Sequence, residues 1–230
     1  MKYFIPYLLP DLLLGFVGCS SEDDSPDNGN PNSQKFLSQV LGFISPASYE
    51  DMNLVWEDNF NGNSLDLSSC SHETTTGQNG WGNNELQYYS TQNTSVEGGN
   101  LIITATKECF SGRDYTSSRK NTQNKKQFRY GSVDLRAVMP KGQGLWPALW
   151  MLGSNFNTVG LPACGEIDIM EMIGGQGREK IFHGSFHWQQ DGNRAEFGGE
   201  YSLTLGTLAV SVSCFFRSLE SQFHSIVHRQ

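Results

Sequence analysis

Short apolar runs separated by turn residues fill the chain from residue 53 onward, and this arrangement restricts the fold more than any other feature. The runs are rich in β-branched and aromatic residues, which favour strands. They are NLVW, ELQYY, LIITATK, FRYGSVDLRAVM, LWPALWML, EIDIMEMI and IFHGSFHW. The turn signals between them are NGN, GQNG, EGGN, PKGQG, GGQG and QDGN. Such a pattern predicts an all-β fold, an antiparallel sandwich or barrel, and 230 residues suit a single domain of this kind.

The first 52 residues lack this pattern and predict an export segment. Residues 1–19 combine Lys2, an apolar stretch and a small residue before Cys19, which is typical of a signal peptide and too short for a comfortable membrane span. Their end, FVGC, resembles the cleavage box of bacterial lipoproteins, in which the cysteine is lipidated. An ordinary signal peptide with an incidental cysteine is the alternative. Residues 20–52, rich in Ser, Asp, Asn, Pro and Gly, predict a flexible linker. We therefore expect a secreted protein, lipid-anchored to the bacterial outer membrane or cell surface.

The final segment, residues 208–230, also departs from the strand pattern. It lacks Gly and Asn turns and has a helix-like mixture of polar and apolar residues. It is either a real terminal element or a region that does not belong to the domain. We therefore assign residues 53–207 to the domain and residues 208–230 to a divergent tail.

The charge balance and the cysteines limit the partners. A formal net charge of −8 and a pI near 5.1 argue against binding to nucleic acid or to an anionic membrane surface. Membrane contact is therefore expected only through the lipid anchor, and a neutral ligand is compatible with the charge. Cys70, Cys109, Cys164 and Cys214 match no CxxC metal framework and are expected to be unconnected thiols. We expect a monomer.

Three carboxylates in GEIDIMEMIG, residues 165–174, are the main functional signal. Side chains alternate in an ideal strand, so Glu166 and Asp168 share one face while Glu171 points the other way. A solvated face and a calcium site are two explanations, but the interleaved apolar residues indicate a buried opposite face, and no DxDxDG-type loop surrounds the acids. The third explanation is paired acid catalysis with a β-bulge at residues 169–170, since one extra residue returns Glu171 to the face of Glu166. Asp168 would then lie between the glutamates and hydrogen-bond Glu166.

At these residues the sequence resembles a known family. GEIDIMEMIG is similar to the active-site strand of glycoside hydrolase family 16 in its bulged ExDxxE form. Four further stretches resemble the laminarinase (endo-β-1,3-glucanase) branch of that family. They are WGNNELQYYS, YTSSR, FRYGSVDLRAVMPKGQGLWPALWML and HGSFHW. The matches occur in order within residues 53–207. The resemblance implies a concanavalin-like jelly-roll β-sandwich and a retaining endo-glycosidase that hydrolyses β-1,3-glucan.

The same resemblance implies roles for the three acids. Glu166 would be the nucleophile, Asp168 its assisting acid and Glu171 the general acid/base of a double displacement through a covalent glycosyl-enzyme. Two alternatives remain open at this point. The first alternative is that the substrate is another β-linked polysaccharide, such as a mixed-linkage glucan or a galactan. The second is that the chain is an inactive truncated or glucan-binding remnant.

Two tryptophans are expected beside the acids. Trp146 and Trp150 share a face if GLWPALWML is a strand, and Pro147 opposes a helix there. Two indoles separated by a small residue suit a platform for sugar rings, whereas two bulky residues at this spacing also suit core packing. The resemblance places both tryptophans in the cleft.

Three polar residues complete the expected cleft. Arg119 and Asn83 match cleft residues of the laminarinase branch, where a guanidinium offers up to five donors to sugar hydroxyls or to the nucleophile. In HGSFHW, polar residues alternate with aromatic ones. We expect His187 to lie near Glu171, with His183 as the second choice.

Three departures from the family pattern carry expectations of their own. Cys70 stands where relatives usually have tryptophan, which would cost packing. Asn59 replaces the usual glutamate at a calcium site on the convex face, so no cofactor is expected and structural calcium is doubtful. After residue 207 relatives continue with further strands, so we expect a truncated sandwich, incomplete at its C-terminus, with exposed edges and one exposed core face.

Overall fold

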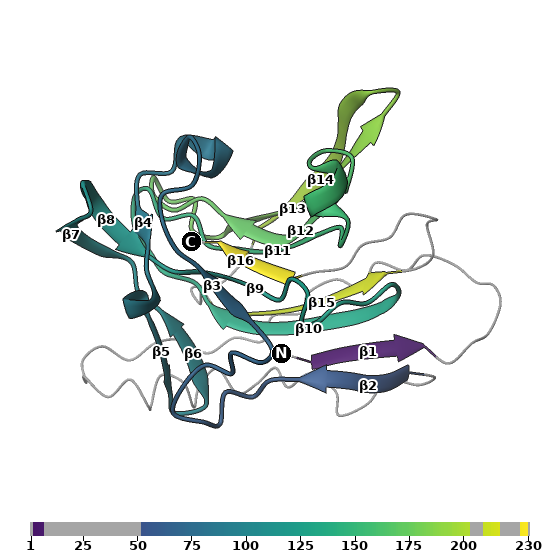
Figure 1. Ribbon diagram of the computed structural model, residues 1–230, viewed down its shortest axis with the longest axis horizontal. Helices are drawn as coiled ribbons and strands as arrows, with labels where there is room; N and C mark the ends of the chain where they lie inside the picture. The colour runs from purple at the N-terminus through teal and green to yellow at the C-terminus, as the bar shows by residue number, and fades with distance from the viewer. Residues whose placement is uncertain (1, 7–51, 203–208, 217–225, 230) are drawn as a thin grey trace.

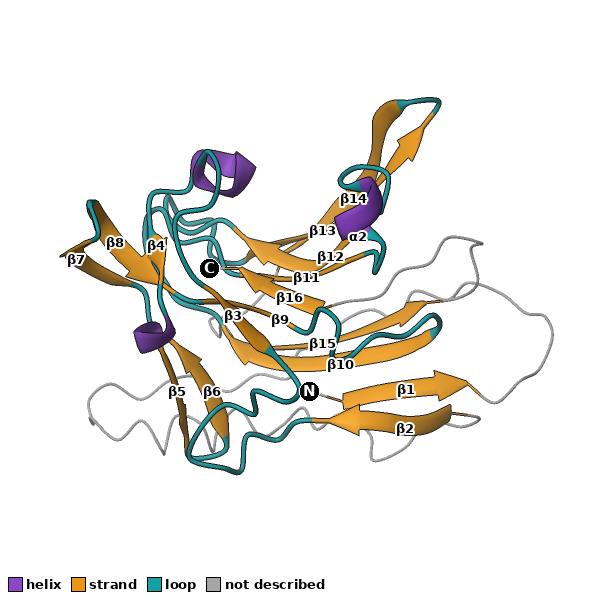
Figure 2. Ribbon diagram, viewed as in Figure 1, coloured by secondary structure: helices purple, strands orange, loops and turns teal. Residues whose placement is uncertain are grey.

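The computed structural model describes residues 2–6, 52–202, 209–216 and 226–229, and two stacked antiparallel sheets form its framework (Figures 1 and 2). The first sheet has the strand order β15-β10-β1-β2 and the second has the order β14-β13-β12-β11-β16-β9-β3. The first consists of β1 (Lys2–Pro6), β2 (Met52–Glu57), β10 (Gly131–Val138) and β15 (Ala209–Phe216). The second consists of β3 (Ser71–Glu73), β9 (Arg119–Asn121), β11 (Ala148–Leu152), β12 (Glu166–Met172), β13 (Ile181–Gln190), β14 (Asn193–Ser202) and β16 (Ile226–Arg229). The predicted all-β antiparallel sandwich is confirmed.

Among the described residues, two small sheets and three short helical segments flank this framework. The sheets are β4-β8-β7 and β5-β6, and β4 pairs with β8 in parallel. Their strands are β4 (Tyr88–Tyr89), β5 (Thr94–Glu97), β6 (Asn100–Ile103), β7 (Thr106–Phe110) and β8 (Arg113–Ser117). The helical segments are a π-type turn (Gly80–Asn84), a 3₁₀ turn (Thr91–Asn93) and α2 (Phe156–Val159). Within the described part of the chain, no helix is long and apolar enough to cross a bilayer.

The main core lies between the two large sheets. Alternate residues of β10, β11 and β12 point into it, as the period of two in a strand requires. The buried cluster consists of Val133, Leu135, Met139, Leu149, Met151, Ile167, Met170, Met172 and Phe182. A second, smaller cluster lies on the opposite face of β11 and contains Ala148, Trp150, Leu152 and Cys164. The strand β11 is therefore buried on both faces, and the outer face of the seven-stranded sheet carries its own packed layer.

The β13–β14 hairpin is long and closes at Asp191-Gly192. Its tip projects beyond the other strands (Figure 1). Both turn residues have positive φ, 52° and 79°, which is the backbone of the type I′ turn that Asp-Gly favours because it matches strand twist. The predicted turn at QDGN is thus confirmed, and it fixes the register of β14 on β13.

Both ends of the described chain contribute strands. β1 lies in the segment predicted as a signal peptide and pairs with β10 and β2, so cleavage before Cys19 would remove it. Cys19 and residues 20–51 of the predicted linker lie outside the described residues. At the other end, β15 pairs with β10 over its whole length, and β16 lies between β11 and β9. The helix-like interpretation of the tail is wrong for these two segments, because pairing with existing strands overrides the weak local pattern.

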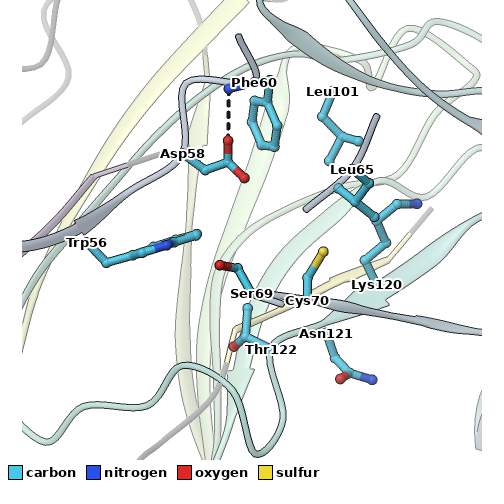
Figure 3. Close-up of a pocket in the computed structure, with 10 residues that line it drawn as sticks. All are labelled: Trp56, Asp58, Phe60, Leu65, Ser69, Cys70, Leu101, Lys120, Asn121 and Thr122. Atoms are coloured by element: carbon cyan, nitrogen blue, oxygen red, sulfur yellow. Dashed lines mark hydrogen bonds between the residues drawn. The ribbon is translucent and has the colours of Figure 1, made fainter. Parts of the chain in front are cut away.

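A small cavity lies beside Cys70, between the chain after β2 and the strand β9 (Figure 3). Its volume is about 30 Å³. Its lining residues are Trp56, Asp58, Phe60, Leu65, Ser69, Cys70, Leu101, Lys120, Asn121 and Thr122. Cys70, the residue expected to cost packing, is one of the residues that line this cavity. Cys70, Cys109 and Cys164, the cysteines whose side chains are described, are free thiols as predicted.

Lys120 is buried beside this cavity. Only 1% of the residue is exposed, and its ammonium donates hydrogen bonds to Thr94 Oγ1 and, at 2.6 Å, to Ser118 Oγ. Burial lowers the pKa of Lys120 to about 8, and the neighbouring Cys70 opposes that shift. Burial also raises the pKa of the Cys70 thiol to about 11.

The buried ammonium predicts a pH dependence of stability. Between pH 8 and 10.5 Lys120 is deprotonated in the folded chain but protonated in the unfolded chain, so its destabilising contribution is fully present below pH 8 and disappears as the pH rises through this window. The Lys120→Met variant lacks this term. The stability advantage of Lys120→Met over the parent should therefore shrink by about 1–3 kcal/mol between pH 8 and 10.5. Urea denaturation at both pH values measures it. The exposed-lysine control Lys107→Met should keep a constant difference from the parent, and a constant difference for Lys120→Met would contradict the prediction.

Candidate active site

A β-bulge in β12 brings the three carboxylates to one face. On the β11 side, Leu149 pairs with Met170 and Trp150 pairs with Asp168, so Ile169 is the extra residue. On the β13 side, the register also shifts between Asp168 and Glu171. The predicted bulge is confirmed, and the pairing with β11 locates it at Ile169.

The register of β11 shows which way the acids point. Glu166, Asp168 and Glu171 pair with the following residues of β11, respectively: Leu152, Trp150 and Ala148. These three partners are spaced two apart and therefore share a face, so the acids share that face too. Between them, Ile167, Met170 and Met172 fill the main core. The bulge therefore places the acids on one face of the strand and the apolar side chains on the other.

Asp168 is buried and held by two side chains of β13. The residue is 4% exposed, and its Oδ2 accepts hydrogen bonds from Ser185 Oγ at 2.7 Å and from His187 Nε2 at 3.0 Å. Its Oδ1 is buried without a hydrogen-bond partner among the described residues. The expected hydrogen bond to Glu166 is thus replaced by bonds to Ser185 and His187, whose register positions place them beside Asp168.

The network around His187 assigns its tautomer. Arg194 Nη2 lies 3.0 Å from His187 Nδ1, and because a guanidinium only donates, Nδ1 must accept. Nε2 then carries the proton and donates it to Asp168. Glu196 Oε2 lies 3.4 Å from His187 Nδ1 and 3.8 Å from Arg194 Nη2, so it is the counter-charge of Arg194 on this side of the ring. The side chain of His187 is thereby fixed at both ring nitrogens.

The expected place of His187 near Glu171 is wrong. His187 pairs in register with Glu166, whereas His183 pairs with Glu171. His183 Nδ1 also lies 3.5 Å from Glu200 Oε1 on β14. The second-choice histidine is therefore the one opposite Glu171, because a four-residue offset along β13 separates the two rings.

A stack of aromatic and cationic groups lies on the other side of the acids. The guanidinium carbon of Arg119 is 4.3 Å from the centroid of the Trp81 ring and 4.9 Å from that of Trp150. Arg119 Nε also forms an ion pair with Glu73 Oε2. Trp150 is only 1% exposed, so the expectation that it offers an open face to a sugar ring is wrong. The half-buried Trp146 precedes β11 rather than lying within it.

The loop that carries Trp81 is organised by a buried carboxylate. Glu85 accepts hydrogen bonds from Asn83 Nδ2 at 3.2 Å, from Gln87 Nε2 at 2.8 Å and from Tyr89 OH at 2.6 Å. Asn83, predicted as a cleft residue, is exposed and shapes this loop. Trp81 itself has a left-handed backbone (φ 56°, ψ 24°).

The structure thus sorts the predicted site residues into three groups. Glu166, Asp168, Glu171 and His187 form one cluster, Arg119 and Trp150 form a second with Trp81 and Glu73, and Asn83 belongs to the Glu85 loop. Trp146, which precedes β11, belongs to none of the three. Ser185, Trp81, Glu73 and Glu85 were not predicted to have a role. The alternation in HGSFHW could have indicated Ser185, whereas Glu73 is found only from the sheet register. In the described part of the chain, no three His, Cys, Asp or Glu side chains are arranged to hold a metal ion.

Comparison with known proteins adds an independent finding. The sequence profile of the glycosyl hydrolases family 16 matches residues 81–209. The chain is 44% identical over 149 residues to the clotting factor G alpha subunit of Tachypleus tridentatus, a match that covers 64% of this chain and 21% of the relative. It is 40% identical over 168 residues to glucan endo-1,3-beta-glucosidase A1 of Niallia circulans, covering 64% and 24%. The chain thus spans about a quarter or less of the length of these relatives.

A solved structure agrees with the fold over most of the chain. The laminarinase catalytic domain of Thermotoga maritima MSB8 matches with a TM-score of 0.70 and 33% sequence identity, over 76% of this chain and 85% of that domain. The expected jelly-roll sandwich is therefore confirmed. The similarity extends to about three quarters of the chain, which includes more than the profile match.

The hydrogen bonds of Asp168 generate a stability prediction. Ser185→Ala removes one of the two donors to a buried carboxylate. We expect the free energy of unfolding at pH 7 to fall by about 1.5–3 kcal/mol, the usual contribution of a hydrogen bond to a charged group. Chemical denaturation measures the change. Ser202→Ala, at the exposed end of β14, should change stability by less than about 0.5 kcal/mol, and equal effects of the two substitutions would contradict the assigned bond.

Proposed function

Because the chain belongs to the glycosyl hydrolases of family 16, we propose that it is a retaining endo-glycosidase that hydrolyses β-1,3-glucan by a two-carboxylate double displacement. The observation that carries this proposal is the bulge at Ile169, which turns Glu166 and Glu171 to the same face. Retaining glycosidases require two carboxyl groups on the scissile bond, about 5–5.5 Å apart. The bulge in β12 turns two carboxyl groups of a single strand to one face, and this supports the proposal.

In the proposed first step, Glu166 attacks the anomeric carbon while Glu171 gives its proton to the departing sugar oxygen. The products are a glycosyl ester on Glu166 and a released chain end. Ester formation removes the charge of Glu166, which favours loss of the proton from the neighbouring carboxyl. In the second step Glu171 accepts a proton from water, and the water oxygen displaces Glu166. Both steps invert the anomeric carbon, so its configuration is retained overall.

Asp168 has a supporting role in this mechanism. It lies between the two glutamates on their common face, and Ser185 and His187 fix its orientation. A carboxylate in this position stabilises the protonated form of one neighbour through like-charge repulsion. The two glutamates are then held in different protonation states, as the first step requires.

The substrate assignment rests on the ligand-facing groups and on the relatives. Two of the similar proteins reported above are named as a laminarinase and a glucan endo-1,3-beta-glucosidase. A neutral glucan suits a chain with a formal net charge of −8. Of the two predicted cleft tryptophans, the half-buried Trp146 is the one that remains for contact with a sugar face.

The proposal includes export and lipid anchoring at Cys19. Its support is the FVGC sequence after the apolar stretch. Incorporation of labelled palmitate into the parent chain expressed in a Gram-negative host, and its loss in Cys19→Ala, tests it; equal labelling of both would contradict it.

The catalytic assignment predicts loss of hydrolysis in two isosteric variants. Glu166→Gln and Glu171→Gln keep the side-chain shape but remove the nucleophile and the proton donor. We expect the full chain to release reducing sugar from laminarin and each variant to be slower by about 10²–10⁴-fold, while cooperative thermal unfolding is preserved. Proton NMR of fresh product ends should show the β anomer first.

The control for these variants is Glu97→Gln, an exposed glutamate at the end of β5, which should keep full activity. Parallel assays on mixed-linkage glucan and on a galactan decide among the candidate substrates. Unchanged rates of hydrolysis in either active-site variant would contradict the assigned roles of Glu166 and Glu171. A parent chain that binds laminarin without cleaving it would favour a glucan-binding function instead.

A further inference from the structure

We propose that Glu73 is a positioning residue of the cleft, whose carboxylate holds the guanidinium of Arg119 against the Trp81 and Trp150 rings and thereby holds Trp81 as a wall of the glucan site. This inference rests on the proposed function for its substrate. It assigns a role to a residue on β3, at the edge of the sheet and outside the motif that carries the acids.

The sheet register places Glu73 and Arg119 on the acid-bearing face. Trp150 pairs with Val227 of β16, Val227 pairs with Asn121 of β9, and Asn121 pairs with Ser71 of β3. Arg119 lies two positions from Asn121, and Glu73 lies two positions from Ser71. Arg119 and Glu73 pair directly with one another. Because side chains two apart share a face, both belong to the face that presents Asp168.

The ion pair between Arg119 and Glu73 is largely buried, which restricts the geometry that it can adopt. The side chain of Arg119 is 8% exposed and that of Glu73 is 26% exposed. A buried guanidinium requires a counter-charge, and Glu73 Oε2 takes the Nε edge of the group. The opposite part of the guanidinium, Nη1, has no hydrogen-bond partner in the described part of the chain. The pair therefore fixes the orientation in which Arg119 meets the two indoles.

The guanidinium that Glu73 orients contacts two indole rings. The guanidinium carbon lies within 5 Å of both ring centroids, inside the range of cation–π attraction, which strengthens where water is excluded. Trp81 has a left-handed backbone that an aromatic residue adopts only when its surroundings impose it. The stack on Arg119 supplies such a constraint, so rotation of the guanidinium would release Trp81.

A stabilising ion pair without a role in binding is the competing explanation. A buried pair is weak support for stability in itself, and the two explanations differ in what they change. Loss of a stability contact lowers the unfolding temperature and leaves KM unchanged. Loss of a positioning contact raises KM while kcat remains, because the interaction acts on bound substrate and transition state alike.

The test uses Glu73→Gln in the full chain, with Glu97→Gln as the matched exposed control. We expect KM for laminarin to rise about tenfold and kcat to change less than about twofold. A cycle with Arg119→Lys checks the route, since Glu73→Gln should cause no further rise in KM once the planar guanidinium is gone. An unchanged KM, or a further full rise in the Arg119→Lys background, overturns the proposal.

A second measurement is independent of catalysis. Near-ultraviolet circular dichroism of the parent, of Trp81→Phe and of Glu73→Gln compares the environment of this indole. We expect Glu73→Gln to lose the part of the signal that Trp81→Phe removes, whereas an unchanged signal overturns the proposal. A parent chain that neither cleaves nor binds laminarin rejects the proposed function, and this spectrum then still decides whether Glu73 positions Trp81.

Discussion

The extra residue at Ile169 is the constraint on which both the core and the site depend. Strict alternation would place Glu171 on the face of Ile167 and would turn Met170 and Met172 away from the core. With the bulge, the two methionines join the main core and Glu171 joins Glu166. A carboxylate left in the core would carry a large desolvation penalty. Hydrophobic burial and carboxylate placement therefore select the same irregular backbone.

The acid-bearing face contains two buried charged groups, Asp168 and Arg119, and different kinds of contact stabilise each of them. Asp168 is held by a hydroxyl and an imidazole from the neighbouring strand. Arg119 is held by a carboxylate and two aromatic rings, because a guanidinium can stack as well as donate. The backbone of β16 lies between these groups and pairs with both β11 and β9. Because register determines which face a side chain lies on, the pairing of β16 with both strands sets the position of the Arg119 cluster relative to the Asp168 cluster.

The sequence was sufficient where structure is determined locally. Period-two patterns and turn residues predicted the sandwich and the Asp-Gly turn, and the spacing of the three acids predicted the bulge, because each depends on a few adjacent residues. It was insufficient where distant strands meet. Arg119 and Glu73 are 46 positions apart, so neither their pair nor the covering of Trp150 is visible in a motif. The tail strands were missed for the same reason, since their pairing partners, rather than their composition, make them extended.

The loop around Trp81 shows how a rigid scaffold maintains a costly local conformation at a candidate binding site. The left-handed Trp81 requires close packing on Gly77, where an added Cβ would lie 2.5 Å from the indole. Glu85 gathers three side-chain donors from within the loop, and Tyr89 anchors it with no exposed surface. This geometry is set by the protein before any ligand arrives, and the contact with Arg119 contributes to it. An indole placed in this way loses little freedom on binding, and a preorganised wall of this kind favours affinity by reducing the entropy lost on association.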